Sequence, residues 1–455
     1  MLSHRYQNAQ QWIFLLLLVS SSGKFNFSCP CKNQADCSYP EKDLGASTEV
    51  FAFSNGTTKV EPWTWDSVTT LVVPAGFKLE NEAQANTMCI AHSKGRKFSI
   101  TAPMTLQRPL NASSEDAAKW VRTMCQQVRT WHADILTVDL LRYFAFNLDS
   151  TGADLMALAQ ILVQVKQEMG ELTKIPFKMA CIVPWKPPCA KDNESCDFAH
   201  LSNDACDYYV IHPDSFTDHD NIRCIARATI PMSKLLYGLS EYNVHHVPPA
   251  KMILGVPWHG YSYECGKLLK DVCYLPKKQG EETCDFSRRN PISYKSIVRD
   301  HESISNAHKA WFDAPHYSIT RNAKQLQIWY EDKDSLTAKY KLVHEMGLKG
   351  VALMYGDDLA TGLTAQDIIS DALMWSFVAH EFLITSTKKP HAVHHDLHYA
   401  DNMAGVAVGC LLLGTALGSI LTCLALRSRI RRPKRFFMHQ ADDTTGFIDE
   451  DDRHL

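Results

Sequence analysis

The sequence predicts an α/β fold, a (β/α)8 TIM barrel, followed by one C-terminal transmembrane helix. Eight strand-like apolar runs alternate with helical segments over residues 24–383, which is the pattern of a parallel barrel. An uncharged stretch, residues 403–426, is followed at once by a cluster of arginines and lysines, as in a stop-transfer helix. The chain has 455 residues, enough for one barrel with appendages, and its net charge of −3 argues against nucleic-acid binding.

The predicted strands are short runs rich in apolar and β-branched residues. In order they are 49–53, 67–73, 97–103, 131–141, 177–185, 206–212, 251–258 and 348–355. Helical spacing predicts helices at 114–128, at 153–172 and at 364–382, and Ser114 is placed to cap the first of them. The segment 260–325, rich in Cys, Lys and Tyr, is predicted to be a small insertion after the seventh strand.

The two ends of the chain predict where it resides. Residues 1–23 have the basic, apolar and small-residue order of a signal peptide. We expect a polar stalk at 384–402, the membrane helix at 403–426 and a cytoplasmic tail at 427–455. The protein is then a single-pass type I membrane protein of the cell surface or an endolysosomal membrane, with a lumenal or extracellular barrel. The spaced glycines of the membrane helix would also suit a homodimer; they are Gly405, Gly409, Gly414 and Gly418.

Cysteines and sequons fit an oxidising, glycosylating compartment. Of fifteen cysteines, Cys410 and Cys423 fall in the predicted span, and the odd remainder leaves one free or bonded to another chain. Cys and His are nowhere spaced as zinc ligands, so we expect no metal and no cofactor. The candidate N-glycosylation sites are Asn26, Asn55, Asn111 and Asn193.

The fourth predicted strand, WHADILTVDLL, carries the chemistry of the chain. Its apolar run is interrupted by Asp134 and Asp139. A carboxylate at the end of a buried strand is costly unless it is used or paired. Residues two apart on a strand share a face, so Asp139 and Leu141 are predicted to face the same pocket. The alternative is that both aspartates are ordinary strand-end residues.

This spacing resembles the signature of glycoside hydrolase family 18, Asp-Gly-x-x-x-Asp-x-Glu. Asp134 falls on the first Asp, Asp139 on the later Asp, and Leu141 on the catalytic Glu. The resemblance implies that this Glu would protonate the glycosidic oxygen, while the preceding Asp orients the N-acetyl group of the substrate. Leucine has no proton to give, and loss of a positioned acid typically costs about 10²–10⁴-fold in rate.

Other stretches resemble the di-N-acetylchitobiase branch of this family over about residues 29–380. They are 29–37, 89–95, 204–207, 255–265, 328–330 and 348–351. Two further departures fall at strand ends. Asp214 stands where the family has a Tyr that holds the acetamido carbonyl, and Met354 stands where a Trp floors the sugar pocket. A one-residue slip would give Tyr355 that second role. The membrane helix is a departure too, because the enzyme of this branch is soluble.

We therefore expect a membrane-anchored, catalytically inactive chitobiase- or chitinase-like protein that binds N-acetylglucosamine glycans or a protein partner. Aromatic rings stack on sugars and carboxylates accept their hydrogen bonds. The candidate glycan contacts are Asp139, Trp185, Trp258, Tyr261 and Tyr355. One alternative is a residual glycosidase for chitobiose-type N-glycan cores or chitin oligosaccharides, with Asp139 or Asp214 as the acid. Another is an adhesion scaffold that uses the insertion or the membrane helix, with an empty pocket.

Overall fold

The structure, a computed structural model, divides the chain into two units, residues 1–387 and 388–455. It describes residues 29–37, 48–56, 60–74, 82–145, 152–173, 176–188, 198, 201, 204–216, 224–278, 284–299, 308–309, 314–359 and 365–383. The predicted signal peptide, stalk, membrane helix and tail lie outside these residues. Among the helices that are described, none has the length and hydrophobicity that a membrane crossing requires.

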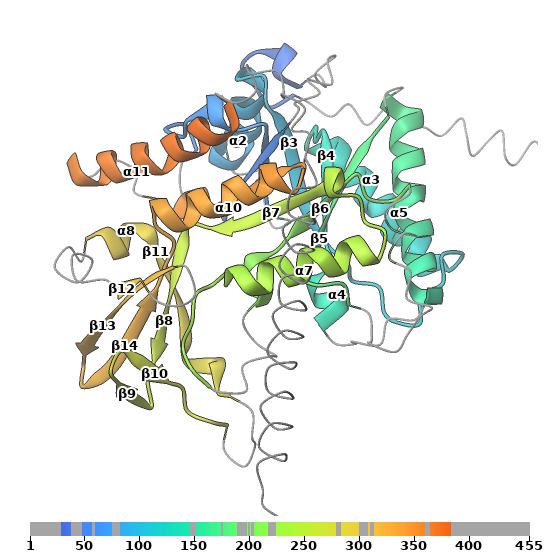
Figure 1. Ribbon diagram of the computed structural model, residues 1–455. Coiled ribbons are helices and arrows are strands. Elements are labelled where there is room, and N and C mark those ends of the chain that lie inside the picture. Colours follow the sequence, from blue (N-terminus) through green and yellow to red (C-terminus); the bar gives the residue numbers. More distant parts are fainter. Residues whose placement is uncertain are drawn as a thin grey trace, which may run out of the picture. The chain divides into compact units, whose positions relative to one another are not determined.

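Eight parallel strands close into a barrel, as the sequence predicts (Figure 1). They are β1 (Glu49–Phe53), β2 (Thr70–Val73), β3 (Lys97–Pro103), β4 (Ile135–Asp139), β5 (Lys178–Val183), β6 (Tyr208–Ile211), β7 (Met252–Pro257) and β15 (Gly350–Met354). Neighbours around the barrel follow the chain, and β15 closes it by pairing with both β7 and β1. The strands are mostly apolar because one face meets the barrel interior and the other meets the helices.

Helices surround the barrel and connect its strands. The longer ones are α2 (Glu82–Ser93), α3 (Glu115–Thr130), α5 (Gly152–Thr173), α7 (Met232–Val244), α10 (Lys333–Glu345) and α11 (Ala365–Val378). Short turns of helix are η1 (Gln34–Cys37), η2 (Trp65–Ser67), α4 (Leu141–Ala145), η3 (Pro213–Phe216), η4 (Pro249–Lys251), η5 (Phe286–Arg288), α8 (Tyr294–Val298), η6 (Gly356–Asp358) and η7 (Ala379–Leu383). The predicted cap of α3 is confirmed, since the Ser114 hydroxyl accepts a hydrogen bond from Ala117 N at 3.1 Å.

The barrel interior is packed with side chains. Its apolar cluster comprises Phe51, Phe53, Val72, Ile135, Ala180, Ile182, Tyr208, Val210, Ile253, Ala352 and Met354. Polar side chains fill the amino end of the barrel interior. Lys97 Nζ, for example, pairs with Glu49 Oε1 at 2.7 Å, and both residues begin their strands. Leu141 and Tyr355, which follow β4 and β15, pack on this cluster. A filled interior leaves the carboxyl ends of the strands as the place for a site.

The insertion after β7 contains two antiparallel sheets that project from the barrel (Figure 1). One sheet has the order β11-β8-β14-β13-β12 and the other is the hairpin β10-β9. The strands are β8 (His259–Glu264), β9 (Lys267–Leu269), β10 (Val272–Tyr274), β11 (Arg289–Ser293), β12 (His308–Lys309), β13 (Pro315–Arg321) and β14 (Lys324–Trp329). The disulfides Cys224–Cys284 and Cys265–Cys273 cross-link this region.

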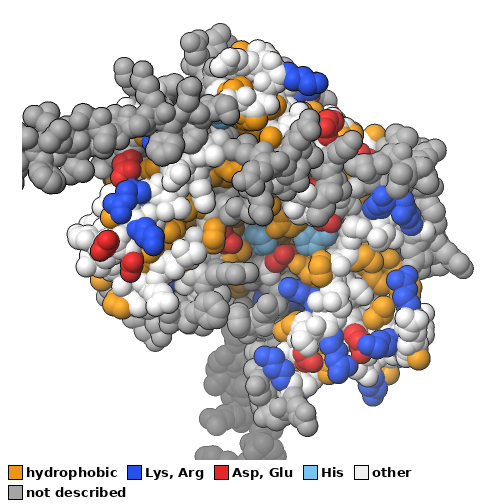
Figure 2. All heavy atoms as spheres, turned by 180° about the vertical axis from the view of Figure 1, so that it is seen from behind, with side chains coloured by type: hydrophobic (Ala, Val, Ile, Leu, Met, Phe, Trp, Pro, Cys, Tyr) orange, Lys and Arg blue, Asp and Glu red, His pale blue; other side chains and the backbone are white. Residues whose placement is uncertain are grey.

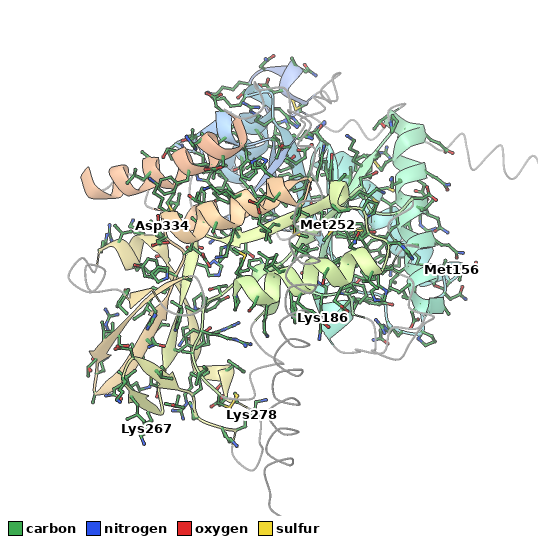
Figure 3. The ribbon with its side chains drawn as sticks, in the orientation of Figure 1. Met156, Lys186, Met252, Lys267, Lys278 and Asp334 are labelled. Carbon is green, nitrogen blue, oxygen red and sulfur yellow. A yellow bond between two sulfur atoms is a disulfide. The ribbon has the colours of Figure 1, made fainter. Side chains whose placement is uncertain are left out.

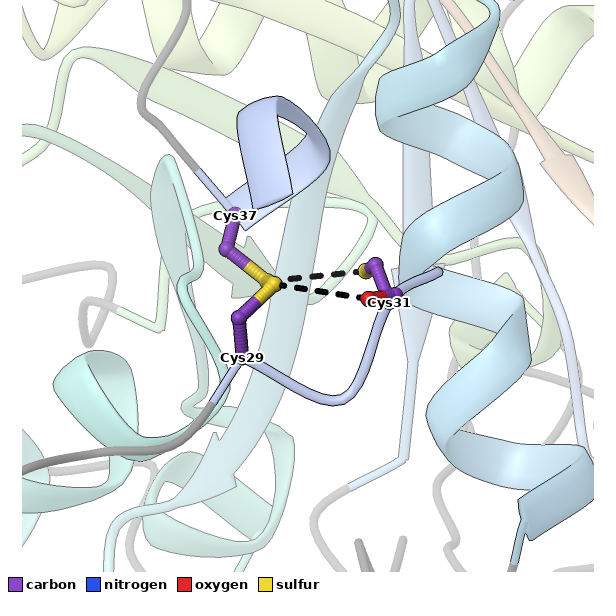
Figure 4. A group of neighbouring side chains, drawn as sticks. All are labelled: Cys29, Cys31 and Cys37. Carbon is purple, nitrogen blue, oxygen red and sulfur yellow. Dashed lines mark hydrogen bonds between the residues drawn. A yellow bond between two sulfur atoms is a disulfide. The ribbon is translucent and has the colours of Figure 1, made fainter. Parts of the chain in front are cut away.

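Disulfides also fix the N-terminal segment to the barrel. Figure 4 shows three neighbouring sulfurs, those of Cys29, Cys31 and Cys37. Cys29 is bonded to Cys37 and Cys31 to Cys89, so these sulfurs cross-link η1 and α2 rather than offering free thiolates to a metal. A further bridge, Cys181–Cys206, joins β5 to the segment before β6.

The unpaired cysteine that an odd count requires has a candidate inside the molecule. Cys125 is free and buried in α3, and burial raises the pKa of its thiol to about 12. At that depth its thiol is not placed to bond another chain. Cys189 and Cys196 lie outside the described residues.

Candidate active site at the carboxyl ends of the barrel strands

The two aspartates of the fourth strand lie at its opposite ends. Asp134 precedes β4, where its Oδ2 accepts a hydrogen bond from Phe98 N at 2.7 Å and pairs with His92 Nε2 at 2.9 Å. Burial lowers the pKa of His92, but the hydrogen bond to Asp134 outweighs burial and the pKa is raised. Asp134 therefore ties β3 to α2 at the amino end of the barrel, away from the carboxyl-end face.

Asp139 and Leu141 lie at the carboxyl end, as predicted. Asp139 is the last residue of β4, and its Oδ1 accepts a hydrogen bond from Leu141 N at 2.9 Å. The Leu141 side chain packs on the barrel-interior cluster together with Tyr355. Where the resemblance calls for a proton donor, the chain thus has an apolar side chain that covers the barrel interior.

A charged group of side chains lies beside these residues. His259, at the start of β8, places Nε2 3.3 Å from Asp214 Oδ1 and Nδ1 3.4 Å from Asp358 Oδ2. Burial lowers the pKa of His259, but the two carboxylates outweigh it and raise the pKa to about 9. The imidazole is therefore a buried cation at neutral pH. We call Asp214, His259, Tyr261 and Asp358 the histidine cluster.

The residues around His259 have shifted pKa values. Burial raises the pKa of Asp214, yet the hydrogen bond with His259 outweighs it and holds the pKa well below its usual range. The Tyr261 hydroxyl lies 3.4 Å from His259 Nε2, and burial beside Asp214 raises its pKa. Asp214 keeps 31% of its side chain exposed, so it is a carboxylate that remains open to a ligand.

Tyr355 connects the histidine cluster to Asp139. Its ring stacks on the His259 ring at a centroid distance of 6.4 Å and meets Phe53 edge-on at 6.5 Å. Burial, followed by the charges of Asp214 and Asp139, raises the pKa of Tyr355 to about 12. The phenol therefore stays protonated and half-buried among carboxylates, where it is able to donate a hydrogen bond.

A second histidine, His212, lies under this group. Burial lowers its pKa, although Asp214 and Asp139 oppose the effect. Its Nδ1 accepts a hydrogen bond from Asp214 N at 3.3 Å, which assigns the proton of the neutral ring to Nε2. The site thus pairs one charged imidazole with one neutral imidazole.

The other aromatic candidates have no open ring face at this site. Trp258 is only 1% exposed and meets Trp375 edge-on at a centroid distance of 4.7 Å, in the core between barrel and helices. Trp185 is 8% exposed and packs against Tyr237 of α7. Tyr261 belongs to the histidine cluster, but its ring is buried under the Arg289 guanidinium at 4.2 Å. Neither indole therefore has an open face in this structure on which a sugar ring could stack.

Three residues of the site were not predicted from the sequence. His212 directly follows β6, His259 directly follows the residue after β7, and Asp358 lies in η6 after β15. A signal was present, because all three are polar and close to the carboxyl end of a barrel strand. On the face in Figure 2, histidine side chains reach the surface beside acidic and apolar ones.

Two of the four candidate glycosylation sites are described, and both are exposed. Asn55 follows β1, and its backbone N donates to Asp357, which neighbours Asp358 of the histidine cluster. Asn111 lines a groove of about 650 Å³ between the loop after β3 and the first turns of α3. Asn26 and Asn193 lie outside the described residues. A glycan on Asn55 would stand at the rim of the candidate site.

Known proteins agree with this architecture. The chain is 25% identical over 350 residues to the di-N-acetylchitobiase of Rattus norvegicus, covering 72% of this chain and 88% of the relative. It is 27% identical over 335 residues to the Homo sapiens di-N-acetylchitobiase, covering 70% and 82%. The GH18 chitinase of Cycas revoluta, solved in complex with (GlcNAc)3, shares the fold with a TM-score of 0.54 and 12% identity, over 73% of this chain and 99% of that one.

The family assignment rests on the barrel sequence itself. The family described as glycosyl hydrolases family 18 matches residues 96–354, from the start of β3 to the end of β15. This match includes β4, β6 and β7, whose carboxyl ends carry Asp139, Asp214 and His259. The chain belongs to glycosyl hydrolase family 18.

Proposed function

We propose that this protein is a non-hydrolysing family 18 barrel, anchored in a membrane, that binds N-acetylglucosamine-containing glycans at the carboxyl ends of its strands. The observation that carries the proposal is Leu141. The resemblance places Leu141 on the family's proton donor. In the structure its backbone N donates a hydrogen bond to Asp139, and its side chain packs on the barrel-interior cluster. An acid is absent from the place where hydrolysis of a glycosidic bond needs one.

Neighbouring groups do not restore the missing proton. Asp214 has its pKa held well below the usual range, so it is ionised at any physiological pH. His259 carries a proton, but its two ring nitrogens face Asp214 and Asp358. Asp139 is the remaining candidate acid for a residual glycosidase, and its Oδ1 is engaged by the Leu141 amide.

The strand-end pattern supports retained binding better than retained chemistry. The resemblance places Asp214 on the Tyr that holds the acetamido carbonyl in the family. In this chain Asp214 follows β6, which ends at Ile211, and its side chain is a carboxylate. The acetamido clamp is then lost, while a hydrogen-bond acceptor is kept at that strand end.

The retained groups suit the hydroxyl and amide N–H groups of an N-acetyl sugar. Asp139 and Asp214 offer carboxylate oxygens as acceptors, and Tyr355 offers a half-buried ring and a protonated phenol. Stacking on one aromatic ring contributes at most a few kcal/mol, so we expect weak affinity for single sugars. The relatives that are enzymes are chitobiases, which makes the chitobiose unit the first ligand to test.

Calorimetric titration of residues 24–387 with N,N′-diacetylchitobiose tests the proposal. This segment contains every described core cluster and disulfide, so it is expected to fold alone. Tyr355→Ala should weaken binding at least about tenfold, because the ring and the phenol are lost together. Asp139→Asn should weaken it less, since the amide still accepts one hydrogen bond.

The matched control is Tyr237→Ala, which removes an exposed tyrosine from α7. It should leave the affinity unchanged. Equal affinity in Tyr355→Ala and wild type would exclude this pocket, and absence of binding to any N-acetylglucosamine oligomer by wild type would favour the scaffold alternative. Thermal unfolding of each variant separates loss of binding from loss of fold.

A further inference from the structure

The hairpin of β9 and β10 presents a continuous apolar face to solvent. Leu269 pairs directly with Val272, and Lys267 pairs directly with Tyr274. Paired residues share a face, and positions two apart on a strand share it too, so all four side chains lie on one side. Leu269 is 46% exposed, Val272 37% and Tyr274 42%.

The opposite face of the same hairpin packs against the rest of the insertion. Cys273 is fully buried and disulfide-bonded to Cys265, and Leu268 packs on the insertion core. A bridge between Ile225 and Tyr274 fixes β10 to the preceding segment. The hairpin is therefore rigid, and its exposed apolar face is not used by the fold of the described residues around it.

Lysines surround this face. Lys267, Lys270, Lys277 and Lys278 are exposed, and Asp271 is the one carboxylate between Lys267 and Lys278 in the sequence. Lys270 and Asp271 form a tight two-residue turn with φ of 44° and 64°. Figure 3 shows Lys267 and Lys278 at the end of the insertion that is farthest from the barrel. The tip thus combines an apolar pair, a tyrosine and a net positive charge.

We infer that this face of the hairpin docks on an anionic membrane surface. Leucine and valine at the tip enter the boundary between headgroups and acyl chains, and tyrosine favours the headgroup level. Lysines extend their ammonium groups to the lipid phosphates and contribute on the order of fivefold each to binding. The positive charge of the tip complements anionic headgroups, which selects a membrane over an apolar protein groove.

The inference stands apart from the proposed sugar site. The hairpin face shares no residue with the histidine cluster or with Asp139.

Flotation of residues 24–387 with lipid vesicles tests whether the hairpin docks on an anionic membrane. Wild type should float with vesicles of 70% phosphatidylcholine and 30% phosphatidylserine, and should not float with phosphatidylcholine alone. Leu269→Ser with Val272→Ser should reduce the bound fraction at least about tenfold. Lys267→Gln with Lys270→Gln should reduce it about twentyfold, and salt should do the same for wild type.

The matched control is Leu236→Ser with Val244→Ser, which removes two apolar side chains that α7 exposes by 44% and 66%. These changes should leave flotation unaltered. Failure of wild type to float with anionic vesicles overturns the inference, as does equal flotation of the hairpin variants. Vesicle-free dimerisation that disappears in the Leu269/Val272 variant would assign the face to a second copy of the chain and also overturn it.

Discussion

Asp139 and Leu141 show how far the chemistry of this barrel depends on individual side chains. Both lie at the carboxyl end of the barrel, because Asp139 is the last residue of β4 and Leu141 is the first residue of α4. One is a carboxylate that accepts a hydrogen bond from the other's amide, and the other packs on the interior cluster. A family 18 barrel thus carries a leucine at the position that the resemblance assigns to the catalytic Glu.

Alternation along β7 explains why Trp258 is buried in the core. In β7, Ile253 belongs to the interior cluster, whereas Leu254, Val256 and Trp258 belong to the core under the helices. Trp258 therefore follows the outward-facing set, and counting by twos along the strand would have placed it there. The same counting does not predict which way the Tyr355 side chain points. Tyr355 follows the last residue of β15, so its orientation depends on the loop.

At the residue scale we predict a pH dependence that belongs to His259. Its folded pKa of about 9 lies above the ordinary 6.5, so its ion pairs stabilise the fold fully below about pH 6.5. That stabilisation, on the order of 3 kcal/mol, is lost as the pH rises through about 9. Denaturant unfolding of wild type from pH 6 to 10 should show this loss, and His259→Gln should lack it.

Asp214 makes the stability depend on pH in the opposite direction, at acidic pH. Asp214 has a lowered pKa, so its contribution is present above its ordinary value of 3.8 and is lost only as the pH falls through the lower folded value. The histidine cluster should therefore remain charged in an acidic endolysosome. His245→Gln, at the end of α7, is the control; a pH profile of His259→Gln that matched wild type would contradict the assignment.

At the scale of elements, the α3 cap gives a simple test. Ser114→Ala removes the acceptor for Ala117 N and should lower the free energy of unfolding by about 1 kcal/mol. Ser114→Asp keeps an oxygen at the cap and should retain most of the stability. Equal losses in the two variants, measured by urea unfolding, would show that the cap does not stabilise α3.

The elements divide clearly into those that the sequence predicts and those that it does not. All eight barrel strands are near-continuous apolar runs, and each was confirmed within a few residues. The insertion strands were not predicted, because they are polar and antiparallel, and pair with distant partners such as Tyr263 with Gln327. The histidine cluster depends on that pairing, since His259 begins β8, and sequence alone does not show how β8 leaves the barrel.

At the scale of the whole molecule, the proposed anchor predicts a sorting difference. The full-length chain should remain in the membrane fraction after carbonate extraction, whereas a chain that ends at residue 387 should appear in the culture medium. Both should shift in size on treatment with peptide N-glycosidase, through Asn55 and Asn111. Secretion of the full-length chain, or retention of both chains in the cytosol, would contradict the predicted type I topology.

The most direct test of the central claim is hydrolysis of a fluorogenic N-acetylchitobioside by residues 24–387 from pH 4 to 8. We expect no turnover by wild type above a mock purification, and none by Leu141→Gln. Leu141→Glu, which differs from Leu141→Gln only in its acid, should recover measurable activity if the rest of the pocket still orients the sugar. Turnover by wild type above the mock purification would contradict the proposal that the barrel does not hydrolyse glycosides. Its loss in Asp139→Asn would then identify Asp139 as the acid, and its survival there would show that the barrel uses another acid.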